Sequence, residues 1–481
     1  MEQRLLLSMR TIGDQTATCR PEALPTKGTR MKTIRIGGGQ GFWGDNNDAA
    51  IHMIRHGDIQ YLACDYLAEL TLSIMQRQRQ KDPKAGYARD FIGLMKETLE
   101  DCLERGIRVV TNAGGMNVAG AADALQQVAQ GTGRRCRIAS ITGDDLLGRL
   151  DELEASGIPI VNMDTGQELK EIRSRIVNAN VYFGHQPIRR ALAEGADIVL
   201  TGRSTDSSMF LAPLAHEFDW AENDYDNLAR GILSGHLLEC GGQGAGGNFD
   251  YGWQTVPDLE NLGYPIAEVT GTTLTITKAP DCGGLISEQS LKEQLYYEIH
   301  DPARYYTPDV IADFSRIRLT ETGENRVRVD GVAGTAPTDT LKLCLGITAG
   351  YRIVAYLPYA WPFAIEKARK AEDILRKILK KRGLKAEVMR FDLLGVNALH
   401  LNTAGEPDYA PNEVVLRVAI RTNDKAEAAK LAPEIAPFNL NGPPANCFFG
   451  GRPKPIEIIA LWPTLIPRDA VKLNVSIREV R

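Results

Sequence analysis

The chain has 481 residues, of which 43% are hydrophobic and 24% charged, as in an ordinary globular protein. This composition excludes collagen-like, coiled-coil and mostly disordered chains. Lys and Arg number 56 against 61 Asp and Glu, so the formal net charge is −5 and no basic excess exists to bind a nucleic-acid backbone. At about 150 residues per domain, the length predicts two or three domains.

The eight cysteines lie far apart and form no C-x-x-C pair, and no apolar run reaches the ~20 residues that a membrane helix needs. Unpaired, scattered cysteines favour a reducing compartment. We therefore expect a cytoplasmic protein without a membrane or nucleic-acid partner. No metal-ligand set is assigned, and the cofactor stays unknown.

Residues 1–30 are set apart from the fold as an extension that we expect to be disordered, because their apolar stretch is too short for a signal peptide. Met31 opens a strand-like run and is an alternative start of translation.

The candidate strands of the N-terminal half are short and apolar, and most are followed by a Gly or Asp turn and an amphipathic helical stretch. They span Thr33–Ile36, Ile59–Cys64, Ile107–Thr111, Arg137–Ile141, Ile158–Val161 and Asp197–Leu200. This alternation predicts an α/β fold whose mainly parallel sheet carries helices on both faces. Ligands of such sheets bind at the carboxyl ends of the strands, so functional residues are expected in the turns that follow.

Beyond about residue 223 the pattern changes to a helix over Leu228–Cys240 and then a Gly-rich loop and strand-like runs. We interpret this segment as a mixed α+β region that continues the first domain, over residues 31–355. A strongly charged helix over Ala364–Leu384, followed by further strands, predicts a smaller C-terminal α/β domain over residues 356–481.

The first turn contains the pattern G-x-G-x-x-G at Gly39, Gly41 and Gly44, after a strand and before a helix. Such glycines let the backbone approach a phosphate, and Asp65 ends the next strand where a dinucleotide fold places its ribose-binding acid. Asp45 argues against this interpretation, because its carboxylate would repel a pyrophosphate. A nucleotide or CoA phosphate site, a purely structural turn and a substrate contact all remain open here.

Two further turns carry polar candidates. Asn112 follows the third strand and can hold a carbonyl or carboxylate, or can simply satisfy its own turn. Asp144 and Asp145 follow the fourth strand. One of them is explained as a helix N-cap, so Asp145 is kept as a candidate acid or base.

The turn after the strand Asp197–Leu200 carries Arg203 and Asp206. Arg203 offers a planar fork for a carboxylate or phosphate. Asp206 is a candidate general base, and a purely structural Arg–Asp pair is the alternative.

His236 and Glu239 lie three residues apart on the helix that precedes the Gly-rich loop, so they share a face and can exchange a proton. A packed structural histidine is the alternative. Cys240 is a weaker candidate nucleophile, because no base is assigned to it. Asn248 ends the loop and is a candidate substrate contact.

Several of these segments, taken in order, resemble the acyclic terpene utilisation AtuA family. They are Gly44-Asp45, Asp65–Glu69, Thr111–Gly115, Gly143–Asp145, Ala196–Asp206 and Gly235–Cys240. The resemblance is close over residues 33–314 and looser from residue 326 onward. It implies a role in bacterial breakdown of acyclic terpenoids such as citronellol and geraniol, beside acyl-CoA enzymes, and it carries over no specific reaction.

Together, these observations predict a homo-oligomeric catabolic enzyme that acts on a carboxylated or CoA-linked acyl substrate by proton-transfer chemistry of the hydratase or lyase type. The candidate catalytic residues are Asp206, Glu239, His236 and Asp145; the substrate-binding ones are Arg203, Asn112, Asp65 and Asn248; and the cofactor-binding ones are Gly39, Gly41 and Gly44. Two alternatives stay open, an NAD(P)-dependent oxidoreductase and a non-catalytic subunit of an acyl-CoA carboxylase assembly.

Overall fold

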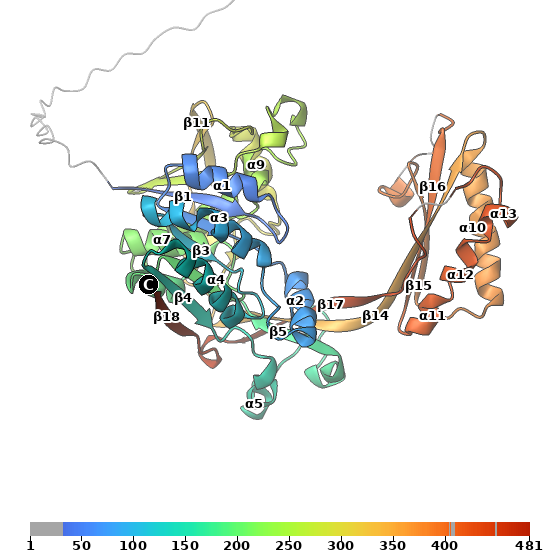
Figure 1. Cartoon of the computed structure of the whole chain (residues 1–481), viewed down its shortest axis with the longest axis horizontal. Helices are drawn as coiled ribbons and strands as arrows, with labels where there is room; N and C mark the ends of the chain where they lie inside the picture. Colours follow the sequence, from blue (N-terminus) through green and yellow to red (C-terminus); the bar gives the residue numbers. More distant parts are fainter. Residues whose placement is uncertain (1–31, 404, 406–408, 448–449) are drawn as a thin grey trace, which may run out of the picture. The chain divides into compact units, whose positions relative to one another are not determined.

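A ten-stranded mixed sheet organises the larger part of the chain (Figure 1). The structure is a computed structural model that describes residues 32–403, 405, 409–447 and 450–481, of which Thr33–Arg481 form one compact unit. The predicted extension over residues 1–30 and the alternative start at Met31 lie outside the described residues.

The centre of this sheet is parallel and runs in the order β1-β2-β3-β6-β4. Its strands are β1 (Thr33–Gln40), β2 (Tyr61–Cys64), β3 (Arg108–Thr111), β6 (Ile198–Thr201) and β4 (Cys136–Thr142). They correspond to five of the six strands that the sequence predicts for this half. The predicted α/β class with a parallel core is therefore confirmed.

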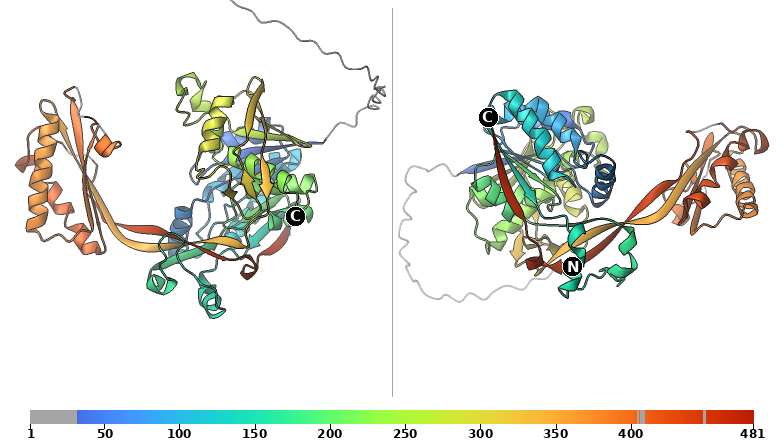
Figure 2. Two further views of the ribbon diagram at one scale, coloured as in Figure 1. Left: turned by 180° about the vertical axis from the view of Figure 1, so that it is seen from behind. Right: turned by 60° about the horizontal axis from the view of Figure 1, so that its bottom comes forward.

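Antiparallel strands extend the sheet at both edges, which makes it mixed. Beyond β1 lie β7 (Pro265–Thr270), β8 (Thr273–Lys278), β12 (Arg326–Asp330) and β11 (Arg318–Gly323). Beyond β4 lies β18 (Asn474–Val480), the last strand of the chain (Figure 2). The C-terminal segment thus returns to the main sheet. The sequence had suggested a separate domain over residues 356–481, and β18 of this segment belongs to the main sheet.

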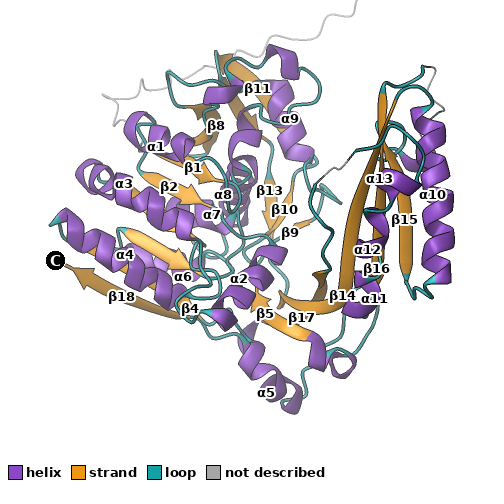
Figure 3. Ribbon diagram, turned by 45° about the vertical axis from the view of Figure 1, so that its right-hand side comes forward, coloured by secondary structure: helices purple, strands orange, loops and turns teal. Residues whose placement is uncertain are grey.

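Helices cover both faces of the main sheet (Figure 3). One face carries α1 (Asn47–His56), α3 (Arg89–Arg105) and α4 (Val118–Thr132), and the other carries α6 (Gln186–Ala193), α7 (Ser208–Glu217) and α8 (Tyr225–Leu238). Successive residues of a strand point to opposite faces, so Ile198 and Leu200 pack under the first set and Val199 under the second. Burial on both sides explains why these strands are continuously apolar.

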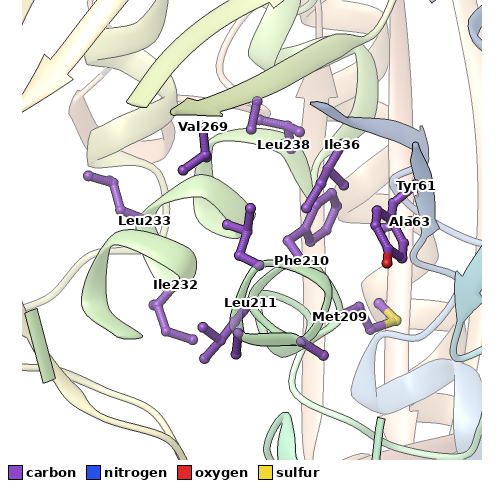
Figure 4. Close-up of a cluster of buried hydrophobic side chains, with 14 of the residues drawn as sticks. Ile36, Tyr61, Ala63, Met209, Phe210, Leu211, Ile232, Leu233, Leu238 and Val269 are labelled. Carbon is purple, nitrogen blue, oxygen red and sulfur yellow. The ribbon is translucent and has the colours of Figure 1, made fainter. Parts of the chain in front are cut away.

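The core on the α7–α8 face is dense (Figure 4). Phe210 and Leu211 of α7 and Ile232 of α8 join Ile36 of β1 and Val269 of β7, all buried in one cluster. This cluster sets the distance between α8 and the carboxyl ends of the parallel strands, where α8 ends.

A second, antiparallel sheet has the order β15-β16-β14-β17, and β5 also pairs with β14. Its strands are β5 (Ile176–Val181), β14 (Thr340–Ala360), β15 (Val388–Leu394), β16 (Glu413–Thr422) and β17 (Ile456–Pro467). The amphipathic α10 (Ala364–Lys381) packs on it through buried residues such as Ala368 and Leu375. Its bounds are close to those of the predicted helix, Ala364–Leu384.

The predicted strand over Ile158–Val161 is wrong, because Val161 makes only an isolated bridge to Glu168. In the same half of the chain, the sequence pattern missed β5, in which Asn178 and Asn180 are buried and hydrogen-bonded to each other. Buried asparagines break the apolar pattern by which a strand is recognised.

The remaining elements are shorter or more peripheral. They are α2 (Glu69–Lys81), α5 (Leu150–Ala155), α9 (Glu288–Tyr296), α11 (Lys425–Ala429), α12 (Ala432–Ile435), α13 (Phe438–Asn441), β9 (Tyr305–Tyr306), β10 (Ile311–Asp313) and β13 (Ala333–Thr335).

The contact between α7 and α8 depends on a glycine. A Cβ atom at Gly235 would lie 2.5 Å from the Cα of Ser207. In an open helix, Gly→Ala stabilises by about 0.5–1 kcal/mol, but here the clash with backbone dominates, so we expect Gly235→Ala to destabilise the fold by about 1–3 kcal/mol. Urea denaturation measures this.

The matched control is Gly93→Ala in α3, where an added Cβ meets nothing within 4 Å. We expect this variant to be more stable than the wild type by about 0.5–1 kcal/mol. Equal stability changes in the two variants would contradict the close α7–α8 contact.

Candidate functional site

A cavity of about 670 Å³ lies at the carboxyl ends of the parallel strands. Its wall includes Gly41 after β1, Asp65 after β2 and Arg203 after β6, together with Glu239 at the end of α8. This is the edge at which open α/β sheets bind their ligands, and the volume lies in the range of small-molecule sites. We call this cavity the cleft.

Arg203 is the cation of the cleft wall. Its side chain is only 3% exposed, and its Nη1 donates to the carbonyl oxygen of Leu67 at 2.5 Å and to Asp206 Oδ1 at 2.6 Å. The guanidinium carbon lies 4.2 Å from the ring centroid of Tyr182. Its Nε is buried and has no partner among the described residues. A buried donor without a partner is costly, so Arg203 retains capacity to bind an anionic group.

Two aspartates beside Arg203 have raised pKa values. Burial raises the pKa of Asp206 well above its usual range, and Asp65 and Glu239 add to this effect, although Arg203 opposes it. Burial likewise raises the pKa of Asp65 to about 6, again against the lowering effect of Arg203. These effects favour the protonated form of Asp206, which is the form able to donate a proton.

Asp65 is held in place by neighbouring groups. Its Oδ1 accepts hydrogen bonds from Asn112 Nδ2 at 2.5 Å and from the Leu67 N–H at 2.9 Å, while Asn112 Oδ1 accepts the Tyr66 N–H at 2.7 Å. Asn112 is fully buried and is not part of the cleft wall. The prediction that Asn112 binds substrate is therefore corrected, since its amide is committed to positioning Asp65.

Glu239 faces the cleft from the end of α8. Its Oε2 accepts a hydrogen bond from Ser207 Oγ at 2.9 Å, and its Oε1 lies 3.5 Å from His236 Nδ1. His236 is 1% exposed and does not line the cleft. The structure thus brings Glu239 to the cleft and leaves His236 behind it, where it has no direct access to substrate.

Two residues that sequence reasoning did not select also act here. Glu69, at the start of α2, lines the cleft and lies 3.1 Å from Lys342 Nζ of β14. Although burial opposes ionisation, Arg203, Tyr182 and Lys342 lower the pKa of Glu69 to about 2. Glu69 belongs to the segment Asp65–Glu69, which already resembled the AtuA family. No local sequence pattern indicates Lys342, which is 273 residues from Glu69.

The glycine motif is not arranged as a phosphate cradle. Gly39 lies inside β1, where a Cβ atom would meet Cys64 Sγ at 2.5 Å, and neither it nor Gly44 lines the cleft. Gly41 does line it, but its N–H donates to Asp45 Oδ2 at 2.8 Å. The structure therefore corrects the expectation that Gly39 and Gly44 hold a cofactor, because these glycines serve the packing and turn of the backbone.

Asp45 does not cap α1, since Asn46 is the N-cap and its Oδ1 accepts the Asp48 N–H. Asp45 instead closes the turn after β1, and Oδ1 accepts a hydrogen bond from the Tyr264 hydroxyl at 2.6 Å. The backbone amide that a phosphate would need is thus already engaged by a carboxylate.

Asp145 lies outside the cleft, which corrects its prediction as an acid or base. Its Oδ1 accepts the Leu147 N–H at 3.1 Å, and the residue bridges to Asn180 of β5. Its neighbour Asp144 supports the site instead, because Asp144 Oδ2 accepts the backbone N–H of Arg203 at 2.8 Å. Adjacent residues in extended backbone point to opposite sides. Asp144 therefore points towards Arg203, and Asp145 points away from it.

The Gly-rich loop after α8 contributes Asn248, which lines the cleft and donates from Nδ2 to Gln243 Oε1 at 3.3 Å. Cys240 lines the cleft too, but burial raises the pKa of its thiol well above the usual value. A thiol that holds its proton this tightly is a poor nucleophile.

Among the described residues, no group of three or more His, Cys, Asp or Glu side chains is suited to hold a metal ion. No helix in the part of the chain that the structure describes is long and apolar enough to cross a membrane.

The fold and the cleft define an α/β protein with a carboxylate-lined pocket around one buried arginine, at the ligand-binding edge of its sheet. The profile of the acyclic terpene utilisation family protein AtuA matches residues 34–477. The chain belongs to this AtuA family, as the sequence motifs predicted.

The comparison with curated proteins gave no match. Among solved structures, a homoserine dehydrogenase from Thiobacillus denitrificans aligns with 10% identity over 83% of this chain and 82% of its own, with a TM-score of 0.15. A likeness this weak carries no argument about fold or function.

Asp144, which accepts the backbone N–H of Arg203, should make the free energy of unfolding depend on pH. Burial raises the pKa of Asp144 to about 6, whereas it is about 3.9 in an unfolded chain. Between these values the native state binds more protons than the unfolded state, so the contribution of Asp144 to stability falls as the pH rises through this window. The uncharged Asp144→Asn should therefore gain about 2–3 kcal/mol over the wild type above pH 7, and the difference should vanish below pH 4.

Urea denaturation of both proteins at several pH values from 4 to 8 measures this difference. A variant that is less stable than the wild type at pH 8 would contradict the burial penalty on the carboxylate.

Proposed function

We propose that the protein is a catabolic enzyme that catalyses a hydratase- or lyase-type reaction on a carboxylated or CoA-linked acyl substrate, in the cleft at the end of the parallel strands. The observation that carries this proposal is the pairing of the buried Arg203 with Asp206 at 2.6 Å, beside Glu239 and Asp65. This arrangement joins an anion-binding group to carboxyls of different proton affinity.

Arg203 would bind the substrate carboxylate or acyl oxygen. A protonated Asp206 leaves the charge of Arg203 without its nearest counter-ion, and the partnerless Nε adds a donor with a second direction. Binding of a carboxylate would in turn favour the protonated form of Asp206 further. Substrate binding and the protonation of Asp206 are therefore coupled.

Asp206 and Glu239 would share the proton transfers. In a hydration, the Glu239 carboxylate removes a proton from water, the hydroxyl adds to the double bond of the substrate, and Asp206 donates its proton to the neighbouring carbon. The sum is addition of one water molecule, and the reverse sequence releases it. General acid and base groups in one site contribute about 10²–10⁴-fold each.

The lining residues favour the acyl part of the substrate over its phosphates. Arg203 is the only Lys or Arg among the residues of the cleft wall, against Asp45, Asp65, Glu69, Asp206, Glu239 and Glu298. The diphosphate of a CoA ester would be repelled by such a wall, so a CoA carrier would stay outside the cleft.

The two alternatives receive less support from this geometry. A nicotinamide dinucleotide needs free amides after β1, and the Gly41 N–H is bound to Asp45. A non-catalytic subunit has no need of a buried arginine in the wall of a cavity.

Incubation of the protein with a panel of unsaturated and hydroxylated carboxylic acids and their CoA esters, read by mass spectrometry for a gain or loss of water, tests the proposal. We expect Asp206→Asn to lose at least ~100-fold in turnover without a fall in melting temperature, because the amide retains the shape and removes the transferable proton. Asp145→Asn is the matched control outside the cleft and should retain turnover.

Undiminished turnover in Asp206→Asn would remove this residue from the mechanism. If only NAD(H) or NADP(H) raises the melting temperature and no acid or ester does, the oxidoreductase alternative replaces the proposal.

The coupling between Asp206 and Arg203 predicts a pH dependence of binding. A carboxylate ligand should bind more weakly as the pH rises and Asp206 loses its proton, because the ionised Asp206 then competes for Arg203. Calorimetric titration with one of the free acids at pH 6 and pH 9 measures it. Affinity that is independent of pH, or that increases with pH, would show that Asp206 does not compete with the ligand.

A further inference from the structure

The structure leaves one group behind the cleft without an assigned role, the buried imidazole of His236. Its ring is 1% exposed and packs beside the aromatic rings of Tyr305 and Phe314, with centroid distances of 5.4 Å and 5.8 Å. Its Nε2 lies 3.2 Å from the carbonyl oxygen of Leu295. The Nδ1 atom is buried and has no hydrogen-bond partner among the described residues.

The contact with Leu295 determines the tautomer of the ring. A carbonyl oxygen only accepts hydrogen bonds, so Nε2 must carry a hydrogen. In a neutral ring the lone pair is then on Nδ1, and Nδ1 lies 3.5 Å from Glu239 Oε1. An ionised Glu239 would place its Oε1, a second acceptor, opposite this buried lone pair.

The buried Nδ1 is then left without a donor and faces a negative charge, which is unfavourable. One proton between them removes the conflict, whether it stays on Nδ1 or on the carboxyl. The other groups around the ring do not supply that proton. Tyr305 has its pKa raised well above the usual range by burial and by Glu239 and Asp206, and Gln294 donates to the backbone carbonyl of His236 instead.

We infer that His236 and Glu239 bind one proton jointly, and that His236 is a positioning residue that holds this proton behind the cleft. The inference rests on the proposed function for its consequence, because it gives Glu239 a partner behind the cleft with which it can exchange a proton. The ring has no outlet to solvent for this proton, since it is 1% exposed and its Nε2 is bound to a carbonyl oxygen.

The test is ¹⁵N NMR of the full chain labelled at histidine, over a pH range from 5 to 9, with Glu239→Gln as the decisive variant and His236→Asn to identify the signal. In the wild type, Nε2 should carry a hydrogen throughout, and the ¹⁵N shift of Nδ1 should show the proton shared with Glu239. In Glu239→Gln the amide can donate to Nδ1 but exchanges no proton, so Nδ1 should show the shift of a hydrogen-bonded nitrogen that carries no hydrogen.

His185 is the internal control, because its Nδ1 is paired with Asp309 at 2.8 Å and should titrate alike in both proteins. The inference is overturned if Nδ1, rather than Nε2, carries the hydrogen of the neutral ring, or if the ¹⁵N shift of Nδ1 is the same in both proteins. The tautomer is read from the wild type alone, so the test does not depend on the folding of the variant.

The NMR experiment and the turnover assay can fail independently of each other. If His236 responds as expected but no acid or ester is turned over, the shared proton stands and the proposed reaction fails. If turnover is found, His236→Asn should lower kcat by about 10–100-fold and leave KM unchanged, whereas a merely structural role would not produce that split.

Discussion

A buried guanidinium dictates much of the architecture around the cleft. Arg203 is 3% exposed, and a charge at that depth persists only when neighbouring groups compensate it. Its partners come from segments that are distant in the sequence: the Leu67 carbonyl, the Asp206 carboxylate and the Tyr182 ring contact its side chain, and Asp144 holds its backbone. The strand ends must therefore be brought together before this charge can be buried.

The same cation divides the surrounding carboxyls into two kinds. Arg203 and Lys342 help to lower the pKa of Glu69 to about 2. Burial outweighs the attraction of Arg203 at the two aspartates, so the pKa of Asp65 is raised to about 6 and that of Asp206 lies well above its usual range. One cavity wall thus holds carboxyl groups that differ widely in proton affinity. Proton-transfer chemistry needs such a division, since an acid and a base must coexist in one site.

The parts of this arrangement that the sequence predicts are those that follow from strand periodicity. Continuous apolar runs identified the parallel strands, and the rule that ligands bind at their carboxyl ends placed Asp65 and Arg203 together. Lys342 was out of reach, because its position depends on the pairing of β14 with β5, whose buried asparagines hide the strand. The choice between Asp144 and Asp145 was equally beyond the pattern, since it depends on which of two adjacent side chains points inward.

The glycine motif shows why a pattern can be correct in its physics and wrong in its function. Glycines permit close approach of any atoms, and here the approaching atoms belong to the protein: Cys64 Sγ at Gly39, and the backbone of Cys240 at Gly41. The turn brings β1 against the loop after α8, and Asp45 then takes the amide that a phosphate would use. A carboxylate in that position adds negative charge to the cleft wall, so an anionic ligand is directed towards Arg203 and away from the turn.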